Sequence, residues 1–306
     1  MKRFFRRLFF FILLCVIPLY VLDYVYSRIV ASSSNKSIEC WAELMEDDIN
    51  ADCIVLGSSR AMNHIIPSVV DSILGSRSFN LGEGGAHMDE IYMRYHLYRK
   101  RNMPASLVLV NIDHSSLSPQ VDFDRYQYFP WFWNKTFREE MFPIKPFTFA
   151  ERILPLYRYR GTRLLGFHRG PKMLERGWSR YEGDFHDEGF EDRVYAFTKD
   201  DAYEKYLDSL LEELRSDGAQ VVFFISPYYK DVLEKMSGMD QMREYYDSLS
   251  RSRGLTFLDY SEIPISQDSS FFSNPMHLNA RGDTILTRSV AYDIKAQYST
   301  HQSEIK

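Results

Sequence analysis

Two residue types with a capacity for acyl chemistry stand out in this chain: a serine behind a glycine and a histidine near the C-terminus. Ser59 lies in the run Gly57-Ser58-Ser59-Arg60, at the end of the mostly apolar DCIVLG (52–57). A serine at a strand-to-helix turn is exposed at the mouth of a sheet, where backbone N–H groups can face a developing oxyanion. His277 lies in FFSNPMHLNARGD (271–283), just before a helical pattern. A base of this kind turns a serine hydroxyl into a nucleophile, although Gly-Ser-Ser is also an ordinary turn and a lone histidine is often structural.

A glycine-rich loop follows the second apolar run. Its sequence is Asn80-Leu81-Gly82-Glu83-Gly84-Gly85, which is compatible with a tight turn or with backbone donors brought close to a substrate. We take Gly82 and Gly85 as candidate oxyanion donors. The candidate substrate-binding residues are Arg60, Asn80 and His114.

The elements that must position these residues are short apolar runs that alternate with amphipathic patterns. The predicted strands cover 52–57, 77–82, 106–113, 219–227 and 255–260, and the predicted helices cover 87–102, 200–218, 236–252 and 280–298. Nearly continuous apolar strands between helices indicate a parallel sheet that is covered on both faces. The sequence therefore predicts a three-layer α/β/α fold, with the functional residues in the loops beyond the carboxyl ends of the strands.

In their order and placement, these motifs resemble those of the SGNH/GDSL hydrolase superfamily. The matching residues are G-x-S after the first strand, N-x-G-x-x-G after the second and H-L-N-x-x-G before the last helix. More narrowly, LGSSR and HLNARG are similar to motifs of membrane-anchored members associated with cell-envelope acylation, including teichoic-acid D-alanylation. The resemblance covers about 52–113 and 219–298, and it implies a central parallel sheet of about five strands. It also implies Ser59 as nucleophile, His277 as general base and the N–H groups of Ser59 and Gly85 as oxyanion donors.

Two positions depart from that family's pattern. Asp113 stands where the family places a side-chain amide in the oxyanion hole, and an ionised carboxylate there must point away or serve another role. Asn274 stands where the family places the acid that orients the histidine. An Asp-to-Asn change in serine proteases lowers turnover roughly 10⁴-fold through the wrong histidine tautomer, yet Cys-His-Asn enzymes orient their histidine with an amide. Asp268 and Asp259 are the candidates for supplying a missing charge.

The N-terminus predicts export. Basic residues at Lys2, Arg3, Arg6 and Arg7 precede the apolar run Leu8–Leu22, which Asp23 interrupts. This arrangement keeps the N-terminus in the cytoplasm and sends the remainder across the membrane. The run fits a signal-peptide core, but the weakly apolar residues 24–30 and a mediocre cleavage site at 29–31 favour an uncleaved anchor. We expect a single-pass protein of the bacterial inner membrane with its body outside the cytoplasm.

Residues 114–199 interrupt the alternation of strands and helices. They begin with the aromatic YQYFPWFWNKTF (126–137), and between Lys145 and Arg180 there are nine Lys/Arg against two acids. The acidic EGDFHDEGFED (182–192) follows. A segment this long between two strands is more often functional than filler. It is either a helical cap that packs its aromatics internally, or a lid or partner surface for sugars, anionic groups or phospholipid headgroups.

Composition sets the remaining limits. The net charge of -5 and pI near 5.9 give no electrostatic case for nucleic acid. Three cysteines are too few for a disulfide framework; a Cys40–Cys53 bridge is an option, but two unpaired thiols, with Cys40 semi-exposed, are the favoured interpretation. The predicted organisation is a membrane segment at 1–30, a tether and short helix at 31–50, an SGNH-like domain at 51–298 that contains the insertion 114–199, and a tail at 299–306.

The leading functional hypothesis is an exported serine esterase or O-acyltransferase that acts on acyl groups, O-acetyl above all, of an envelope polysaccharide or glycolipid. It needs no cofactor and no metal. The alternative is a catalytically silent SGNH-like module that binds glycan or a membrane-bound O-acyltransferase partner through the insertion, with Arg158, Arg160 and Arg163 as the charges to test.

Overall fold

The computed structural model describes residues 1–46, 48–119, 125–161, 172–181, 184–187 and 195–304. The chain divides into two compact units. The first unit contains Met1–Met45 and Phe123–Met173, and the second contains Glu46–Asp122 and Leu174–Lys306. Arg163 and most of the acidic stretch 182–192 lie outside the described residues.

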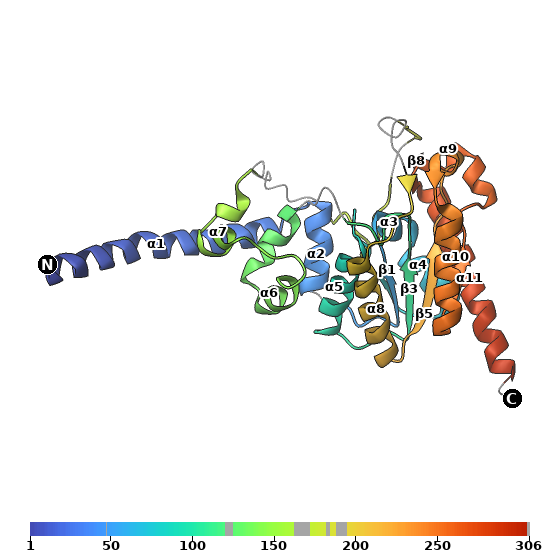
Figure 1. Ribbon diagram of the computed structural model, residues 1–306, viewed down its shortest axis with the longest axis horizontal. Coiled ribbons are helices and arrows are strands. Elements are labelled where there is room, and N and C mark those ends of the chain that lie inside the picture. Colours follow the sequence, from blue (N-terminus) through green and yellow to red (C-terminus); the bar gives the residue numbers. More distant parts are fainter. Residues whose placement is uncertain (47, 120–124, 162–171, 182–183, 188–194, 305–306) are drawn as a thin grey trace. The chain divides into compact units, whose positions relative to one another are not determined.

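The second unit is built on a five-stranded parallel sheet (Figure 1). Its strands are β1 (Cys53–Leu56), β2 (Ser78–Asn80), β3 (Leu107–Asn111), β5 (Gln220–Ile225) and β7 (Thr256–Asp259), in the order β2-β1-β3-β5-β7. The register pairs Cys53 with Ser78 and with Leu107, and Leu107 with Gln220. Because the chain moves outward in both directions from β1 and β3, the carboxyl ends of these two strands form the switch point where such sheets bind ligands.

Helices cover both faces of this sheet. One face carries α3 (Ser59–His64), α4 (Pro67–Leu74) and α11 (Ala280–Glu304), and the other carries α5 (Met88–Arg99), α8 (Asp201–Ser216) and α10 (Met239–Arg253). Alternate strand residues point to opposite faces, so Val222 and Phe224 pack with Leu286 of α11, whereas the Phe223 ring contacts Tyr246 of α10. The predicted three-layer α/β/α fold is confirmed.

Smaller elements complete the second unit. They are β4 (Tyr195–Ala196) paired with β6 (Met236–Ser237), α9 (Lys230–Lys235), the 3-10 turns η3 (Pro264–Gln267) and η4 (Ser269–Phe271), and the antiparallel pair β8 (Phe272–Asn274) and β9 (His277–Leu278). The last helix continues beyond the predicted residue 298 to Glu304. The helix predicted from residue 236 begins at Met239, because Gly238 adopts φ 81° and the two residues before it form β6.

The first unit is helical. It contains α1 (Lys2–Ala31), α2 (Lys36–Glu46, which ends at the unit boundary), α6 (Lys135–Met141) and α7 (Phe149–Ile153), with the 3-10 turns η1 (Arg125–Trp133) and η2 (Tyr157–Tyr159). By length and composition α1 can cross a membrane, which agrees with the predicted membrane segment. Aromatic side chains of the insertion pack among themselves: Phe129 and Phe132 both contact the Phe147 ring.

The three cysteines all lie in the described part of the chain, and none of them forms a disulfide, as favoured from the sequence. The expectation that Cys40 is semi-exposed was wrong, because Cys40 lies on the buried side of α2 with 2% of its surface exposed. Burial raises the pKa of Cys53 to about 12, so this residue is a protonated core side chain of β1.

Candidate active site

Ser59 begins α3 at the turn that follows β1. Ser58 caps the helix, with its side chain accepting the N–H of Arg60. Gly57 precedes it at φ 143°, and a Cβ there would come within 2.8 Å of the Asn111 carbonyl oxygen. Only glycine therefore lets β1 turn this sharply beside β3, and the turn leaves Ser59 half-buried at the edge of the sheet.

Ser59, His277 and Asn274 form a connected chain of side chains. The Oγ of Ser59 lies 2.9 Å from Nε2 of His277. On the opposite side of the ring, Nδ1 of His277 lies 3.0 Å from Oδ1 of Asn274. These three residues come from α3, β9 and β8; α3 is far from the other two in the sequence, and those two are held together by the pairing of Asn274 with His277.

The backbone decides which tautomer His277 adopts. The N–H groups of Met276 and His277 both donate to the Asn274 side chain, each at 3.0 Å, so the atom that faces them must be the amide oxygen. That oxygen can only accept, and Nδ1 of His277 must therefore carry the proton. Nε2 is left with a lone pair directed at the Ser59 hydroxyl, which is the arrangement a general base requires.

The two candidate carboxylates are engaged with other groups. Asp268 is exposed and caps η4, where its Oδ1 accepts the N–H of Ser270 at 2.9 Å. Asp259 accepts the N–H and the hydroxyl of Ser261 and forms an ion pair with Arg243 at 2.8 Å. The described partner of the His277 Nδ1 is thus an amide oxygen, and we assign the orienting role to Asn274 ahead of Asp268.

The helix that begins with Ser59 also holds the loop that carries His277. Arg60, with 1% of its surface exposed, donates to the carbonyl oxygen of Met276 at 2.8 Å, and Nε2 of His64 accepts the N–H of Leu278 at 3.1 Å. The residues on both sides of His277 are therefore fixed to α3. Burial lowers the pKa of His64 well below its ordinary value, with Arg60 and His277 acting in the same direction, so His64 is a neutral acceptor.

Arg60 has further partners that place it away from the role expected from the sequence. Its guanidinium donates to the carbonyl oxygens of Ser226 and Pro227, and it stacks 3.6 Å from the centre of the Tyr228 ring. A guanidinium so enclosed binds backbone, and we reassign Arg60 from a substrate-binding residue to a positioning residue.

Asp113 follows β3 and points toward Ser58, the residue before Ser59. Its Oδ2 accepts the hydroxyl of Ser58 at 2.6 Å, and its Oδ1 accepts the N–H and hydroxyl of Ser115. Burial opposes ionisation, but His114, the Ser58 hydroxyl and Arg60 hold the pKa of Asp113 below its ordinary value. Burial also lowers the pKa of His114, so His114 is neutral at neutral pH. Arg60 is then the positive charge that stabilises the Asp113 carboxylate. Asp113 is thus ionised, and its carboxylate holds the Ser58 side chain in place.

Asn80 and Asn111 make structural hydrogen bonds. Asn80 is fully buried and donates to the carbonyl oxygens of Ala61 and Ile65, which fastens α3 to the end of β2. Asn111 donates to the Ser226 hydroxyl at 3.0 Å, so its amide is directed at the residue that follows β5. Asn80 therefore positions α3 and does not face a substrate.

The remaining predicted residues lie in the loops around the sheet's carboxyl edge. The N–H of Gly82 donates to Oδ1 of Asn80, and a Cβ at Gly82 would come within 2.4 Å of the Met62 nitrogen. Gly85 is exposed in the turn beyond it, at φ 72°. His114 is half-buried, and its ring contacts those of Tyr195 and Tyr228 edge-on. Gly82 serves close packing, which leaves Gly85 as the better oxyanion candidate of the two.

The end of the predicted insertion returns to the second unit, and no local pattern in the sequence predicts this. Residues 174–181, here called the strap, run against α3 and β2. The N–H of Ser179 donates to the Met62 carbonyl oxygen, and Nε1 of Trp178 donates to that of Asn63 at 2.8 Å. The strap ends at Tyr181, whose ring lies 5.0 Å from that of His277. Burial raises the pKa of Tyr181, so its phenol stays protonated and neutral where it packs beside His277.

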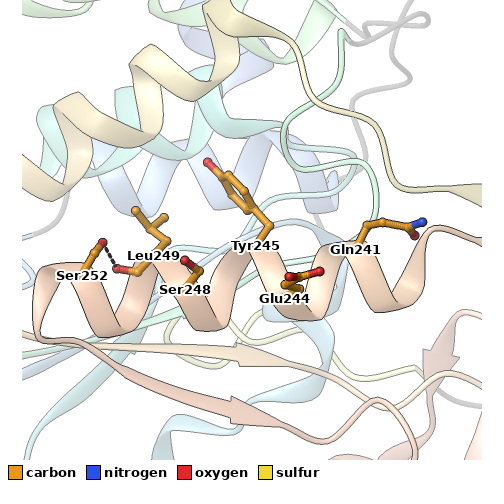
Figure 2. A pocket seen from close by; sticks show the side chains of 6 residues that line it. All are labelled: Gln241, Glu244, Tyr245, Ser248, Leu249 and Ser252. Carbon is orange, nitrogen blue, oxygen red and sulfur yellow. Dashed lines mark hydrogen bonds between the residues drawn. The ribbon is translucent and has the colours of Figure 1, made fainter.

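A surface pocket of the second unit lies elsewhere. Figure 2 shows its lining residues along one side of α10: Gln241, Glu244, Tyr245, Ser248, Leu249 and Ser252. None of these belongs to the loops that hold Ser59 and His277. Among the described residues, no group of three or more His, Cys, Asp or Glu side chains is arranged to hold a metal ion.

Neither a known family profile nor a curated protein sequence matches the chain. Solved structures to which it is similar include a GDSL-like lipase from Bacteroides thetaiotaomicron, at 8% identity, with 80% of this chain and 88% of that chain covered and a TM-score of 0.39. They also include a catalytic mutant of an acetylxylan esterase from Geobacillus stearothermophilus, at 14% identity, with coverage of 81% and 94% and a TM-score of 0.37.

Proposed function

We propose that this chain is an SGNH-like serine esterase or O-acyltransferase that acts on O-acyl groups, acetyl above all, of a cell-envelope polysaccharide or glycolipid. The observation that carries the proposal is the chain Ser59–His277–Asn274, with 2.9 Å and 3.0 Å between the successive polar atoms. The envelope substrate follows from the resemblance of the motifs and from the apolar helix α1, which would hold the enzyme at a membrane.

In the first half of the proposed reaction, the Ser59 hydroxyl attacks the acyl carbonyl carbon while Nε2 of His277 takes its proton. The Asn274 oxygen holds the Nδ1 proton of the resulting imidazolium. The N–H groups of Ser59 and Gly85 receive the oxyanion, as the resemblance implies. The imidazolium then protonates the departing sugar oxygen, and the acyl group remains on Ser59 as an ester.

In the second half, His277 takes a proton from the incoming acceptor. Water gives the free acid, and a sugar hydroxyl gives a transferred ester; in both cases the proton returns to the Ser59 oxygen as the acyl bond breaks. Tyr181 lies beside the histidine and narrows the space from which the acceptor can approach.

The test is acyl release and transfer by the purified full-length protein. We expect hydrolysis of 4-nitrophenyl acetate and release of acetate from acetylated polysaccharide, both of which Ser59→Ala should lower by at least about 10³-fold. Ser252→Ala is the matched control, because Ser252 is exposed on α10 and lies outside the candidate site. Equal activity of the Ser59→Ala variant and the parent would refute the proposal.

A binding role without turnover is the second candidate. The observation in its favour is Asp113, whose carboxylate stands where the resemblance implies an amide donor for the oxyanion. Unaltered biological activity of Ser59→Ala, together with loss of activity on replacing the exposed Arg160, would favour this role. Arg158 is unsuited to that experiment because it is buried in an ion pair with Asp23.

A further inference from the structure

The first unit contains a buried ion pair that involves the apolar helix α1. Asp23 interrupts the apolar run in the sequence, yet it has 0% of its surface exposed. Its Oδ2 accepts from Nη2 of Arg158 at 2.6 Å and from Nε1 of Trp133 at 2.9 Å, and its Oδ1 accepts the N–H of Leu156 at 2.7 Å. A buried pair is tolerated when its remaining polar atoms are satisfied in this way. These contacts fix residues 125–161, here called the arm, to one side of α1.

The same contacts set the level at which the arm meets α1. The Tyr20 hydroxyl donates to the carbonyl oxygen of Ile153, at the end of α7. The Trp133 ring contacts those of Tyr20 and Tyr24 edge-on. The end of α7 therefore lies beside residues 20–23 of α1, at the last turn of the apolar run.

This level falls inside a bilayer that α1 crosses. From Leu8 to Leu22 a helix rises about 21 Å, whereas a hydrocarbon core is about 30 Å thick. The exposed side of α1 stays apolar beyond Asp23, at Tyr24 and Val25. A core that begins at Leu8 would reach roughly the level of Ser27, which leaves Tyr20 about 10 Å inside its far boundary.

The arm exposes large apolar side chains at this level. Phe149 is 80% exposed, Ile153 48% and Leu154 50%. Exposed clusters of this kind mark a partner surface or a membrane contact. Continuity with the apolar surface of α1, where Ile17 and Val21 are 54% and 57% exposed, points to lipid. Arg152 and Arg160 border the cluster and suit anionic headgroups.

We propose that the segment 149–157 is a second membrane contact: it lies within about 10 Å of the boundary between headgroups and acyl chains, on the acyl-chain side, with Phe149, Ile153 and Leu154 inserted among the lipids. The leaflet is the one opposite the basic N-terminus. The arm thereby covers Asp23 inside the membrane and lets a helix with an internal acid serve as an anchor. This role is independent of whether Ser59 is catalytic.

The test places an environment-sensitive NBD label on single cysteines of the full-length protein in phosphatidylcholine–phosphatidylglycerol vesicles. The background carries Cys15→Ser, and Cys40 and Cys53 stay because they are buried. Labels at Ile153→Cys and, separately, Leu154→Cys should emit at shorter wavelength and be quenched by doxyl-labelled lipid. The membrane reference is the parent protein, which keeps Cys15 and is labelled there in α1. The aqueous reference is a label at the exposed Glu212→Cys of α8 in the Cys15→Ser background.

Quenching of both arm labels at least about threefold above the Glu212 label, at every protein-to-lipid ratio, supports the proposal. Labels at 153 and 154 that are quenched by aqueous iodide and not by doxyl lipid overturn it, with the Cys15 label showing whether α1 itself is inserted. A blue shift that grows with protein density without lipid quenching also overturns it, because a second copy would then cover the cluster.

Discussion

At the scale of single residues, Asn274 is the position that decides how the candidate site works. Its side-chain oxygen accepts hydrogen bonds from two backbone N–H groups and from the His277 ring. This fixes the proton of His277 on Nδ1. An amide that could rotate would also permit the tautomer in which Nε2 carries the proton and cannot act as a base. What the amide lacks is the negative charge that stabilises an imidazolium.

Asn274→Asp should therefore raise kcat for acetyl esters by roughly tenfold or more, because a carboxylate accepts the same three N–H groups and adds the missing charge. Asn274→Ala is the opposite variant and should lower kcat by about 10²–10⁴-fold. Steady-state kinetics at equal thermal stability separate the two. If the folded Asn274→Asp variant had a lower kcat than the parent, the assigned role of the amide would be contradicted.

At the scale of elements, α3 joins Ser59 to His277. It begins with Ser59 and supplies Arg60 and His64, which bind the backbone on either side of His277. A helix of six residues can therefore hold Ser59 beside His277, although the two are more than two hundred residues apart in the sequence. The helix is in turn fastened by Asn80, the last residue of β2.

Arg60→Lys should lower kcat by roughly 10- to 100-fold with little change in KM, because a lysine cannot reach three carbonyl oxygens at once. A misplaced base slows the chemical step and leaves ester binding intact. The measurement is the kcat and KM of the variant well below its melting temperature. An effect confined to KM would instead indicate direct contact between Arg60 and the substrate.

His64 should make folding stability fall with acidification. Its pKa in the folded protein lies well below 6.5, so the unfolded chain binds the extra proton first. The contribution of His64 to the free energy of unfolding is then fully present above about pH 6.5. Below that pH it declines by up to ~1.4 kcal/mol per pH unit, until the pH reaches the folded pKa. Urea unfolding between pH 7 and pH 5 should show this slope, and His64→Gln should reduce it. An unchanged slope in that variant would assign the effect to another group.

The strap should be sensitive to a single methyl group. Gly177 adopts φ 81°, and a Cβ there would come within 1.7 Å of the Asn80 carbonyl oxygen. We expect Gly177→Ala to lower the free energy of unfolding by about 2–4 kcal/mol. Gly254→Ala is the matched control, since it has φ 67° with nothing within 4 Å and should lose only about 1 kcal/mol. If urea unfolding gave the same loss of free energy for both variants, the strap would have moved to make room for the methyl group, and the prediction would be wrong.

At the scale of the whole molecule, the sequence predicted the sheet because its strands are continuous apolar runs between amphipathic helices. It also predicted that Ser59 lies beyond the carboxyl end of the first strand, where such sheets bind ligands. His277, in the antiparallel strand β9, was instead predicted from its position before the last helix and from the resemblance of the motifs. The sequence could not predict the positions of Arg60 and Asn80 inside the fold, because polar residues after a strand look alike whether they face substrate or backbone. The strap and the Asp23–Arg158 pair were equally hidden, as both depend on contacts between residues distant in the chain.

The most direct test of the central claim is covalent labelling of the folded, full-length protein with a fluorophosphonate, followed by peptide mass spectrometry. We predict a single adduct on Ser59, which is absent in Ser59→Ala and strongly reduced in His277→Ala, because the reagent reports a serine activated by its base. Failure to label the folded protein, or an adduct that forms at Ser59 equally well without His277, would contradict the account.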